Sequence, residues 1–367
     1  MPDKDSPFRR HSLVDQIADS LRTSIRSEQW KGHLPAERAL AERLGASRPL
    51  IRKALHRLRD AGWLRVVPGH PAEILRRSRH QRTKPAVRRV VLLFGESPDA
   101  VGQWPILVVD AIRKKLYDQG IQFEFVVELR LKKRFPETLL QQLVDRYLAT
   151  DWILAGMPAS VQGWFQSQGL PAVIMGNRFP DITIPFVNDD LQAVAHHAAT
   201  RFLGLGHRKV VFLMRNLGAA GEPAEEAGFL QAFQTSKAAT GWVVKHSSQV
   251  ENIQNRLRAL FSDHEKPTGL LVSHAMDVLV VITWFLENGL RIPQDVSLIS
   301  FQWESFLDRV RPLPAWYHTN PKKHAARLCR CITNANTDRD AVGLTFPEFV
   351  RNNALARPGR QPFATEI

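Results

Sequence analysis

The chain has 367 residues, of which 44% are hydrophobic and 23% charged, the composition of an ordinary folded protein of two or three domains. Its two cysteines, Cys329 and Cys331, exclude a disulfide framework and a four-ligand zinc site. The first residues lack the apolar stretch of a signal peptide, and the longest apolar run, residues 278–286, is too short to span a bilayer. We therefore expect a cytoplasmic protein with no membrane role, no metal and no other cofactor.

The positive charge is concentrated in the first quarter of the chain. Residues 1–89 carry 21 Lys and Arg against 9 Asp and Glu, whereas residues 90–367 carry 29 against 27. Nearly all of the net charge of +14 therefore belongs to the first segment. A basic excess confined to one small segment is typical of a domain that binds a polyanion, because each neutralised phosphate releases counterions.

Three helices are predicted in this basic segment. Apolar residues recur with a helical period from Leu13 to Ile25, and the breaker KGHLP follows. Pro35 opens a short second helix, which Gly45 ends in the left-handed conformation. Ser47 then caps a third helix. The spacing of its apolar residues predicts a buried face made of Ile51, Ala54, Leu55 and Leu58.

The third helix carries basic residues on its opposite, outer arc, namely Arg48, Arg52, His56 and Arg59. Two short helices joined by a turn that contains glycine indicate a helix-turn-helix, whose second helix enters the DNA major groove. An arginine there can hold O6 and N7 of a guanine with two hydrogen bonds. The following text, LRVVPGHPAEIL, predicts two strands joined by a Pro-Gly tip, a wing whose tip approaches phosphates or the minor groove.

The text LPAERALAERLGASRPLIRKALHRLRDAGWL, followed by PGHP, resembles the winged helix-turn-helix of the GntR family. It contains the family's Leu-Pro-x-Glu-Arg, Ser-Arg-x-x-x-Arg-x-Ala-Leu and Gly-Trp-Leu signatures in order. The resemblance implies that double-stranded operator DNA is bound by Arg38, Ser47, Arg48, Arg52, Gly69 and His70. For any one of these arginines taken alone, the alternative is a side chain on a solvated surface.

The remaining three quarters of the chain alternate between short apolar runs and helical segments. Residues 77–89 are basic, almost without apolar side chains, and are predicted to be a linker between a head of residues 1–76 and a larger domain of residues 90–356. Strands are predicted for VVLLFG, FEFVV, WILAG, AVIMGN, KVVFLM, WVVKH, GLLVS and SLISF. The alternation predicts parallel sheets covered by helices, and the number of strands predicts two sheets, hence two lobes with a cleft between them.

The second half of this larger domain resembles the effector domain of the LacI/GalR family, which shares the type I fold of periplasmic sugar-binding proteins. The matching text is FVNDDLQAVAHHAATRFLGLGHRKVVFL, then GFLQAF, then PTGLLVSHAMDVLVVITWFLENGLRIPQDVSLISF. With a GntR-type head, the chain is similar to the arabinose-repressor subgroup. The family's polar sugar contacts have changed, since Glu225 stands for an Arg, His274 and Ala275 for Asn-Asp, and Gln302 and Trp303 for Asp-Asp. A sugar of the usual kind therefore cannot be assumed.

Loop residues after the strands form the predicted effector pocket, because ligands of such folds bind beyond the carboxyl ends of the strands. We expect it to contain Gln103, Trp104, Asn177, Arg178, Asp189, His274, Gln302 and Trp303. Two tryptophans offer apolar faces for stacking a ring. The alternative is that Trp104 and Trp303 only seal the lobes and that Arg178 pairs with a surface carboxylate. His196, His197 and His207 are interpreted as structural.

No phosphate loop, zinc-protease motif, nucleophile elbow or metal-binding spacing is present in the sequence, so no catalytic function is predicted. The combined patterns predict a transcriptional regulator, by default a repressor, that binds operator DNA as a homodimer and responds to a small-molecule effector. Two alternatives stay open. One is a protein whose second domain serves only to dimerise, and the less favoured one is fusion to an aminotransferase-like domain.

Overall fold

The computed structural model describes residues 13–26, 29–30, 32–60, 63–66, 70–74, 88–97, 102–132, 137–234, 236, 238–262, 266–333 and 342–358. The chain divides into two compact units, residues 1–84 and 85–367. Most of the predicted linker lies outside the described residues, so its bounds and those of the flanking domains stay predictions. Within the described ranges, no helix has the length and apolar character needed to cross a membrane.

The first unit contains the predicted three helices and two-stranded wing. Its elements are α1 (Leu13–Arg26), α2 (Glu37–Leu44), α3 (Arg48–Asp60), β1 (Leu64–Arg65) and β2 (Glu73–Ile74). The two strands pair antiparallel, as a hairpin requires. Buried residues of all three helices form one core with the base of the wing. The predicted winged helix-turn-helix is confirmed. Its hydrophobic core consists of residues of the first unit and takes up the inner face of α3, so the outer face of α3 is exposed to solvent.

Helix α2 begins two residues later than the sequence pattern predicts. Pro35 precedes the helix and Ala36 is its N-cap, with an extended ψ of 149°. The backbone N–H of Leu34 donates to the carbonyl of Ala72 at 2.9 Å, which ties this stretch to the wing and keeps it extended. Gly45 has a φ of 57°, so the predicted left-handed end of the helix is confirmed.

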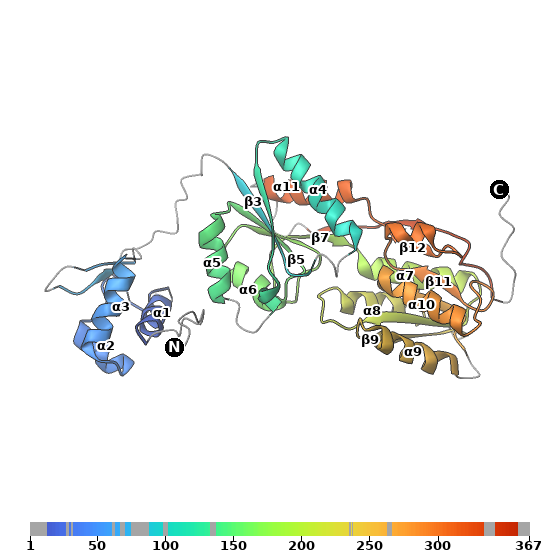
Figure 1. The fold of residues 1–367 in the computed structure, drawn as a ribbon, viewed down its shortest axis with the longest axis horizontal. Helices are drawn as coiled ribbons and strands as arrows, with labels where there is room; N and C mark the ends of the chain where they lie inside the picture. Colours follow the sequence, from blue (N-terminus) through green and yellow to red (C-terminus); the bar gives the residue numbers. More distant parts are fainter. Residues whose placement is uncertain are drawn as a thin grey trace, which may run out of the picture. The chain divides into compact units, whose positions relative to one another are not determined.

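The second unit contains two six-stranded sheets, which we call the N-lobe and the C-lobe (Figure 1). The N-lobe sheet has the order β13-β7-β6-β5-β3-β4 and the C-lobe sheet β14-β12-β11-β10-β8-β9. Every pairing in the two sheets is parallel except that of β12 with β14. The eight predicted strands are β3 (Arg89–Phe94), β4 (Gln122–Val127), β5 (Asp151–Ala155), β6 (Ala172–Met175), β8 (Lys209–Arg215), β9 (Thr240–His246), β10 (Gly269–Val272) and β11 (Ser297–Ser300). The two-lobed parallel fold is therefore confirmed.

Four further strands complete the sheets. They are β7 (Phe186–Asp189), β12 (Ala315–His318), β13 (Val342–Thr345) and β14 (Glu348–Val350). The chain passes from one lobe to the other after β7, after β12 and after β13. These three crossings place the ends of strands from both lobes beside one another, at the position where a ligand site is expected.

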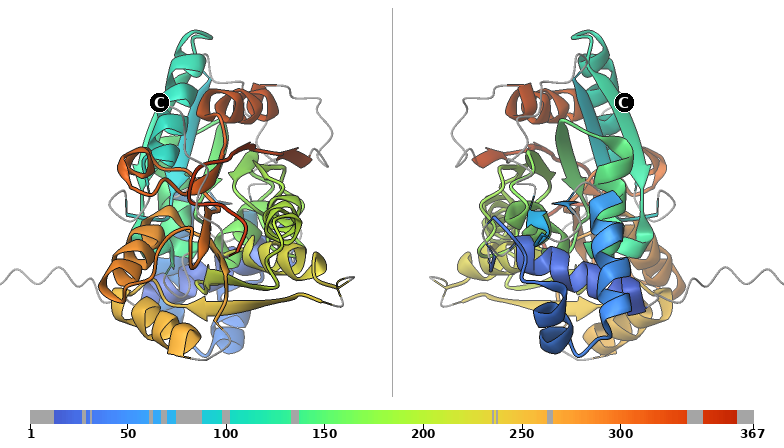
Figure 2. Two further views of the ribbon diagram at one scale, coloured as in Figure 1. Left: turned by 90° about the vertical axis from the view of Figure 1, so that its right-hand side faces the viewer. Right: turned by 90° about the vertical axis from the view of Figure 1, so that its left-hand side faces the viewer.

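In the N-lobe, α4 (Gln103–Tyr117) and α11 (Pro321–Thr333) cover one face of the sheet, and α5 (Glu137–Tyr147) and α6 (Ala159–Ser167) cover the other (Figure 1). The side views place α11 next to α4 although they are far apart in sequence (Figure 2). Strand β3 is buried on both faces, which explains its continuous apolar run. A short 3-10 helix, η1 (Leu129–Lys132), follows β4.

In the C-lobe, α9 (Val250–Ser262) and α10 (Ala275–Glu287) pack on one face of the sheet. The other face is covered by α7 (Leu191–Gly204) and α8 (Glu222–Gln231). A 3-10 helix, η2 (Ser305–Arg309), lies between β11 and β12. Two separate cores, one on each side of the sheet, make the lobe a rigid support for the loops that follow its strands.

Candidate functional site

The outer face of α3 is the candidate DNA-binding surface. The predicted inner residues Ile51, Ala54, Leu55 and Leu58 are at most 3% exposed. The predicted outer residues Arg48, Arg52, His56 and Arg59 are all exposed. Three turns of the helix therefore present basic side chains away from the core, the arrangement that a recognition helix requires.

Arg52 is held on this surface by an acidic residue of the preceding helix. Its Nη2 donates to Oε2 of Glu37 at 2.8 Å, and its Nε donates to Oε1 at 3.2 Å. The hydrogen bond from Arg52 holds the pKa of the Glu37 carboxyl below its ordinary value. The Arg52 side chain is 59% exposed, so solvent screens this ion pair and it adds little to the stability of the fold. Glu37 therefore orients the guanidinium of Arg52, and little free energy is needed to break this ion pair when Arg52 binds another group.

The other predicted DNA contacts are distributed around α3. Arg38 lies on α2, exposed and paired with Glu42 at 3.2 Å. Ser47 is exposed at the start of α3, and its carbonyl accepts the N–H groups of Leu50 and Ile51. His70 is exposed in the wing, and Gly69 lies outside the described residues. Their roles in DNA binding stay predictions.

A cavity of about 370 Å³ between the N-lobe and the C-lobe is the candidate effector site. Its volume is in the range of natural small-molecule pockets. Both lobes contribute to its wall, which includes Glu96, Gly102, Trp104, Asn188, Asp189, Arg215, Leu217, Glu222, Glu225, Ser273, His274, Phe301, Gln302, Trp303, Glu304, Tyr317 and Thr319.

The structure brings five of the eight predicted pocket residues together in this wall, namely Trp104, Asp189, His274, Gln302 and Trp303. The other three are not part of it. Gln103 is exposed on the first turn of α4. The amide oxygen of Asn177 accepts a hydrogen bond from Asn188 at 3.0 Å, and the Arg178 guanidinium lies 5.3 Å from the ring centre of Phe186.

Asp189 connects the three crossings between the lobes. It ends β7, and its carboxylate accepts hydrogen bonds from the hydroxyls of Thr319 after β12 and of Thr345 at the end of β13. Burial raises the pKa of the Asp189 carboxyl. Because one side chain joins all three strands, a ligand that contacts Asp189 acts directly on the hinge between the lobes.

Glu304 is a second link between the lobes, and it was not among the residues predicted from the sequence. Glu304 belongs to the C-lobe, and its buried carboxylate accepts hydrogen bonds from two backbone N–H groups of the N-lobe. The donors are Gln103 at 2.6 Å and Trp104 at 3.4 Å, at the N-terminus of α4. A carboxylate is favoured there by the helix dipole. A Cβ atom on Gly102 would lie 1.9 Å from Oε1 of Glu304, so this approach requires glycine.

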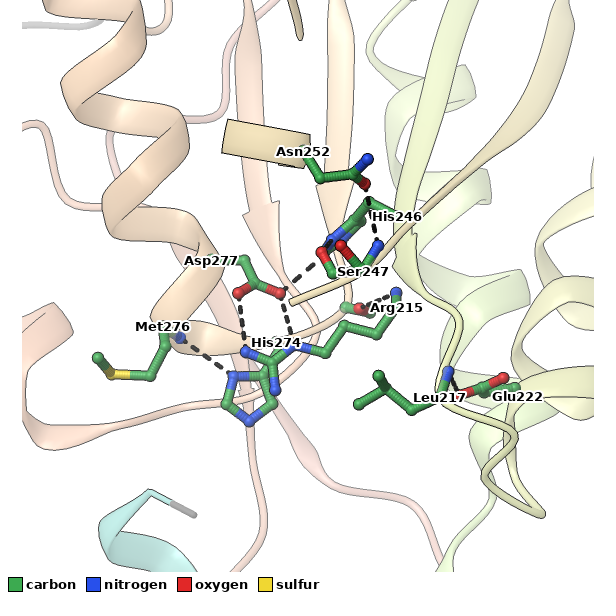
Figure 3. Close-up of polar contacts among 10 residues, drawn as sticks. Arg215, Leu217, Glu222, His246, Ser247, Asn252, His274, Met276 and Asp277 are labelled. Atoms are coloured by element: carbon green, nitrogen blue, oxygen red, sulfur yellow. Dashed lines mark hydrogen bonds and ion pairs between the residues drawn. The ribbon is translucent and has the colours of Figure 1, made fainter. Parts of the chain in front are cut away.

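Arg215 is the only arginine that the described part of the chain contributes to the cavity wall, and Asp277 neutralises it (Figure 3). The guanidinium donates to both carboxylate oxygens of Asp277, at 2.7 and 2.8 Å. Nε2 of the buried His246 lies 3.8 Å from the same carboxylate. His274 caps α10 by accepting the N–H of Met276 on Nδ1, and burial together with Arg215 lowers its pKa to about 4. His274 is therefore neutral in the cavity.

The two tryptophans of the wall are fixed by their own hydrogen bonds. Nε1 of Trp104 donates to the carbonyl of Thr319 at 2.7 Å, and Nε1 of Trp303 donates to the Asp308 carboxylate at 3.2 Å. Each ring also packs edge-to-face against a histidine, Trp104 against His324 and Trp303 against His318, so only the part of each ring that lines the cavity can make apolar or cation–π contact with a ligand.

His207 lies outside the cavity, in the core of the C-lobe, and its burial predicts how the stability of the protein depends on pH. Its ring nitrogens contact Thr268 Oγ1 and the Ala356 carbonyl, each at 2.9 Å, and burial lowers its pKa from 6.5 to about 4. As the pH falls from 6.5 to 4, the unfolded chain gains a proton here that the folded chain does not. We expect this group to lower the free energy of unfolding across that window by about 3 kcal/mol.

The measurement is chemical unfolding of the protein at several pH values, compared with the variant His207→Gln. The variant should lose less stability between pH 6.5 and 4 than the wild type does. His196→Gln, on the exposed face of α7, is the matched control and should follow the wild type. Equal slopes for all three proteins would mean that His207 does not titrate as described.

Comparison with known proteins identifies both units. Residues 13–74 match the family model "Bacterial regulatory proteins, gntR family", and residues 199–343 match "Periplasmic binding protein-like domain". The chain is 22% identical over 327 residues to the arabinose metabolism transcriptional repressor of Halalkalibacterium halodurans, covering 85% of this chain and 86% of that protein. It is 23% identical over 141 residues to the transcriptional regulator KdgR of Bacillus subtilis, covering 37% of this chain but only 42% of KdgR.

Solved structures agree on the fold of the second unit. A LacI family transcriptional regulator from Enterococcus faecium, determined with bound ribose, superimposes with a TM-score of 0.60 at 15% identity, covering 74% of this chain and 99% of that one. The architecture and the basic helix define a DNA-binding transcriptional regulator. The chain joins a GntR-type helix-turn-helix domain to a periplasmic-binding-protein-like domain, and its relatives are regulators of the GntR and LacI types.

Proposed function

We propose that the protein is an effector-controlled repressor that binds a two-fold symmetric operator as a homodimer. The observation that carries this proposal is the pairing of an exposed basic α3 with a second unit that contains a cavity between two lobes. The first is suited to double-stranded DNA and the second to a small molecule. The relative that aligns over most of both chains is named as a repressor, which supports the direction of control.

An exposed apolar surface on the N-lobe supports the homodimer. Ile106 and Leu107 on α4 and Phe125 on β4 are 53%, 37% and 37% exposed, and they line a depression of about 460 Å³ with Pro105 and Val109. An exposed apolar patch of this kind could pair two identical chains around a two-fold axis. Two heads can then contact two half-sites of one operator.

The cavity supports control by an effector. A compound that contacts Asp189 and Glu304 touches both links between the lobes, so it can favour one arrangement of the lobes over another. It changes operator binding only to the extent that it binds one arrangement better. Release of the operator on binding is the direction we propose, and no catalytic role is assigned.

The number of protein chains bound to each operator duplex tests the proposal. A duplex recovered from random sequence with the full-length protein is titrated and analysed by sedimentation, and we expect two chains for each duplex. One chain per duplex would contradict the homodimer. Specific, tight DNA binding that no small molecule alters would instead favour a protein whose second unit only dimerises.

A further inference from the structure

The cavity wall carries an excess of negative charge. Among the described residues, the carboxyl groups of Glu96, Asp189, Glu222, Glu225 and Glu304 line it, against one guanidinium, that of Arg215. Residues 90–367 as a whole are nearly neutral, with 29 basic and 27 acidic residues. The acidic character is therefore a property of this cavity and not of the unit that contains it.

Positive charge near the wall comes from Arg215, Lys132 and Arg327, and Arg327 opposes the rise that burial causes in the pKa of the Asp189 carboxyl. Arg215 is neutralised by Asp277 with two hydrogen bonds, and Glu96 is paired with Lys132 at 3.2 Å. The other four carboxylates have no salt-bridge partner within the part of the chain that the structure describes. Asp189 accepts two threonine hydroxyls, Glu222 accepts the backbone N–H groups of Leu217 and Gly218, and Glu304 accepts those at the start of α4.

Glu225 is the least satisfied of the four. Among the described residues it has neither a hydrogen-bond partner nor an ion-pair partner, although it lines the cavity wall. Burial and the neighbouring Glu222 raise the pKa of its carboxyl to about 8. At neutral pH this carboxyl is therefore mostly protonated, and a positive charge brought beside it would favour its ionised form.

We propose that the effector is an organic amine, protonated at neutral pH, whose ammonium group is received by Glu225 and whose body lies against Trp104 and Trp303. This rests on the proposed effector function of the cavity. Within the described residues no three carboxylate, histidine or cysteine side chains are close enough to hold a metal ion, so a bare cation does not fit. The aromatic wall suits an organic cation because rings attract positive charge through their faces.

The amine also provides a reason for the lobes to close. Asp189 comes from the N-lobe, whereas Glu222 comes from the C-lobe. Like charges on opposite walls repel one another when the lobes approach. An ammonium ion between them cancels this repulsion, so it binds the closed arrangement more tightly than the open one. A neutral sugar has no such effect.

The test uses matched ligand pairs with the full-length protein. Glucosamine is compared with glucose, and putrescine with butanediol, by isothermal titration calorimetry and thermal unfolding. In at least one pair the amine should bind and raise the melting temperature, and its uncharged partner should not. The two pairs distinguish an amino sugar from a linear amine. Gluconate, an anion, should not bind.

Two variants of α8 make the test specific. Glu225→Gln keeps the size of the side chain but cannot ionise when the ammonium group arrives, so the affinity for the amine should fall by about tenfold or more. Glu226→Gln is the control, because Glu226 is the adjacent residue, pairs with Lys245 at 2.6 Å and does not line the cavity. Its affinity for the amine should stay that of the wild type.

Tighter binding of glucose or gluconate than of the amines would overturn the inference and leave the proposed effector function intact. An unchanged amine affinity in Glu225→Gln would also overturn it, as would the absence of any response to amines at millimolar concentration. If the wild-type protein without ligand did not bind an operator, that result would instead contradict the proposed function itself. Circular dichroism of both variants shows whether the C-lobe remains folded.

Discussion

Replacing Arg52 by alanine is expected to lower the affinity for the operator by about tenfold to a hundredfold, because a guanidinium that holds a guanine contributes about 1 to 3 kcal/mol of discrimination. Arg52 lies on the exposed face of α3, opposite the buried Leu55 and Leu58. The measurement is a gel-shift titration of the full-length protein, and the melting temperature of the variant should stay near that of the wild type.

Glu37→Gln separates base reading from a role in holding the helices together. The change weakens the 2.8 Å ion pair and leaves Arg52 in place. If Arg52 reads DNA, this variant should bind the operator at least as tightly as the wild type. The guanidinium of Arg52 then no longer has to break an ion pair with Glu37 before it binds a base. If Arg52 only joins α2 to α3, Glu37→Gln and Arg52→Ala should weaken binding alike, and that result would contradict the recognition role.

A negative charge at Ile106 is expected to separate the homodimer and to weaken operator binding by about a hundredfold or more, since two linked heads gain avidity that one head lacks. Ile106 is 53% exposed, so Ile106→Glu should not disturb the fold of the N-lobe. Sedimentation equilibrium measures the association of the chains, and the gel-shift titration measures the operator affinity.

The control for this change is Gln142→Glu. Gln142 is exposed on α5, on the face of the N-lobe sheet opposite to α4 (Figure 1). It adds a negative charge without touching the apolar patch, so the dimer should persist. A dimeric Ile106→Glu variant with unchanged operator affinity would mean that the chains associate through another surface.

The head could be predicted from the sequence almost completely, because its signals are local. The spacing of the apolar residues correctly predicted the buried face of α3. The glycine at position 45 correctly predicted the end of α2, where the backbone is left-handed. The start of α2 was the exception. The hydrogen bond from Leu34 to Ala72 joins residues far apart in sequence, and no local pattern reveals it.

In the second unit, the eight long apolar runs predicted their strands, whereas β13 and β14 did not stand out. Both are short and lie at sheet edges, where half-exposed residues such as Leu344 carry little pattern. Glu304 was missed for a different reason. It acts through a contact across the lobes with the start of α4, 200 residues earlier in the chain. The substitution of Glu225 for the family's Arg was the one local signal of an acidic cavity.

The central claim is that α3 reads a base sequence in duplex DNA, and selection from a random library tests it most directly. The full-length protein is incubated with random duplexes, the bound fraction is amplified, and the cycle is repeated and sequenced, with the double variant Arg48→Ala/Arg52→Ala in parallel. The account predicts that the wild type enriches a two-fold symmetric motif containing guanines, which the double variant fails to enrich. The same motif enriched by both proteins, or no motif enriched by the wild type, would contradict it.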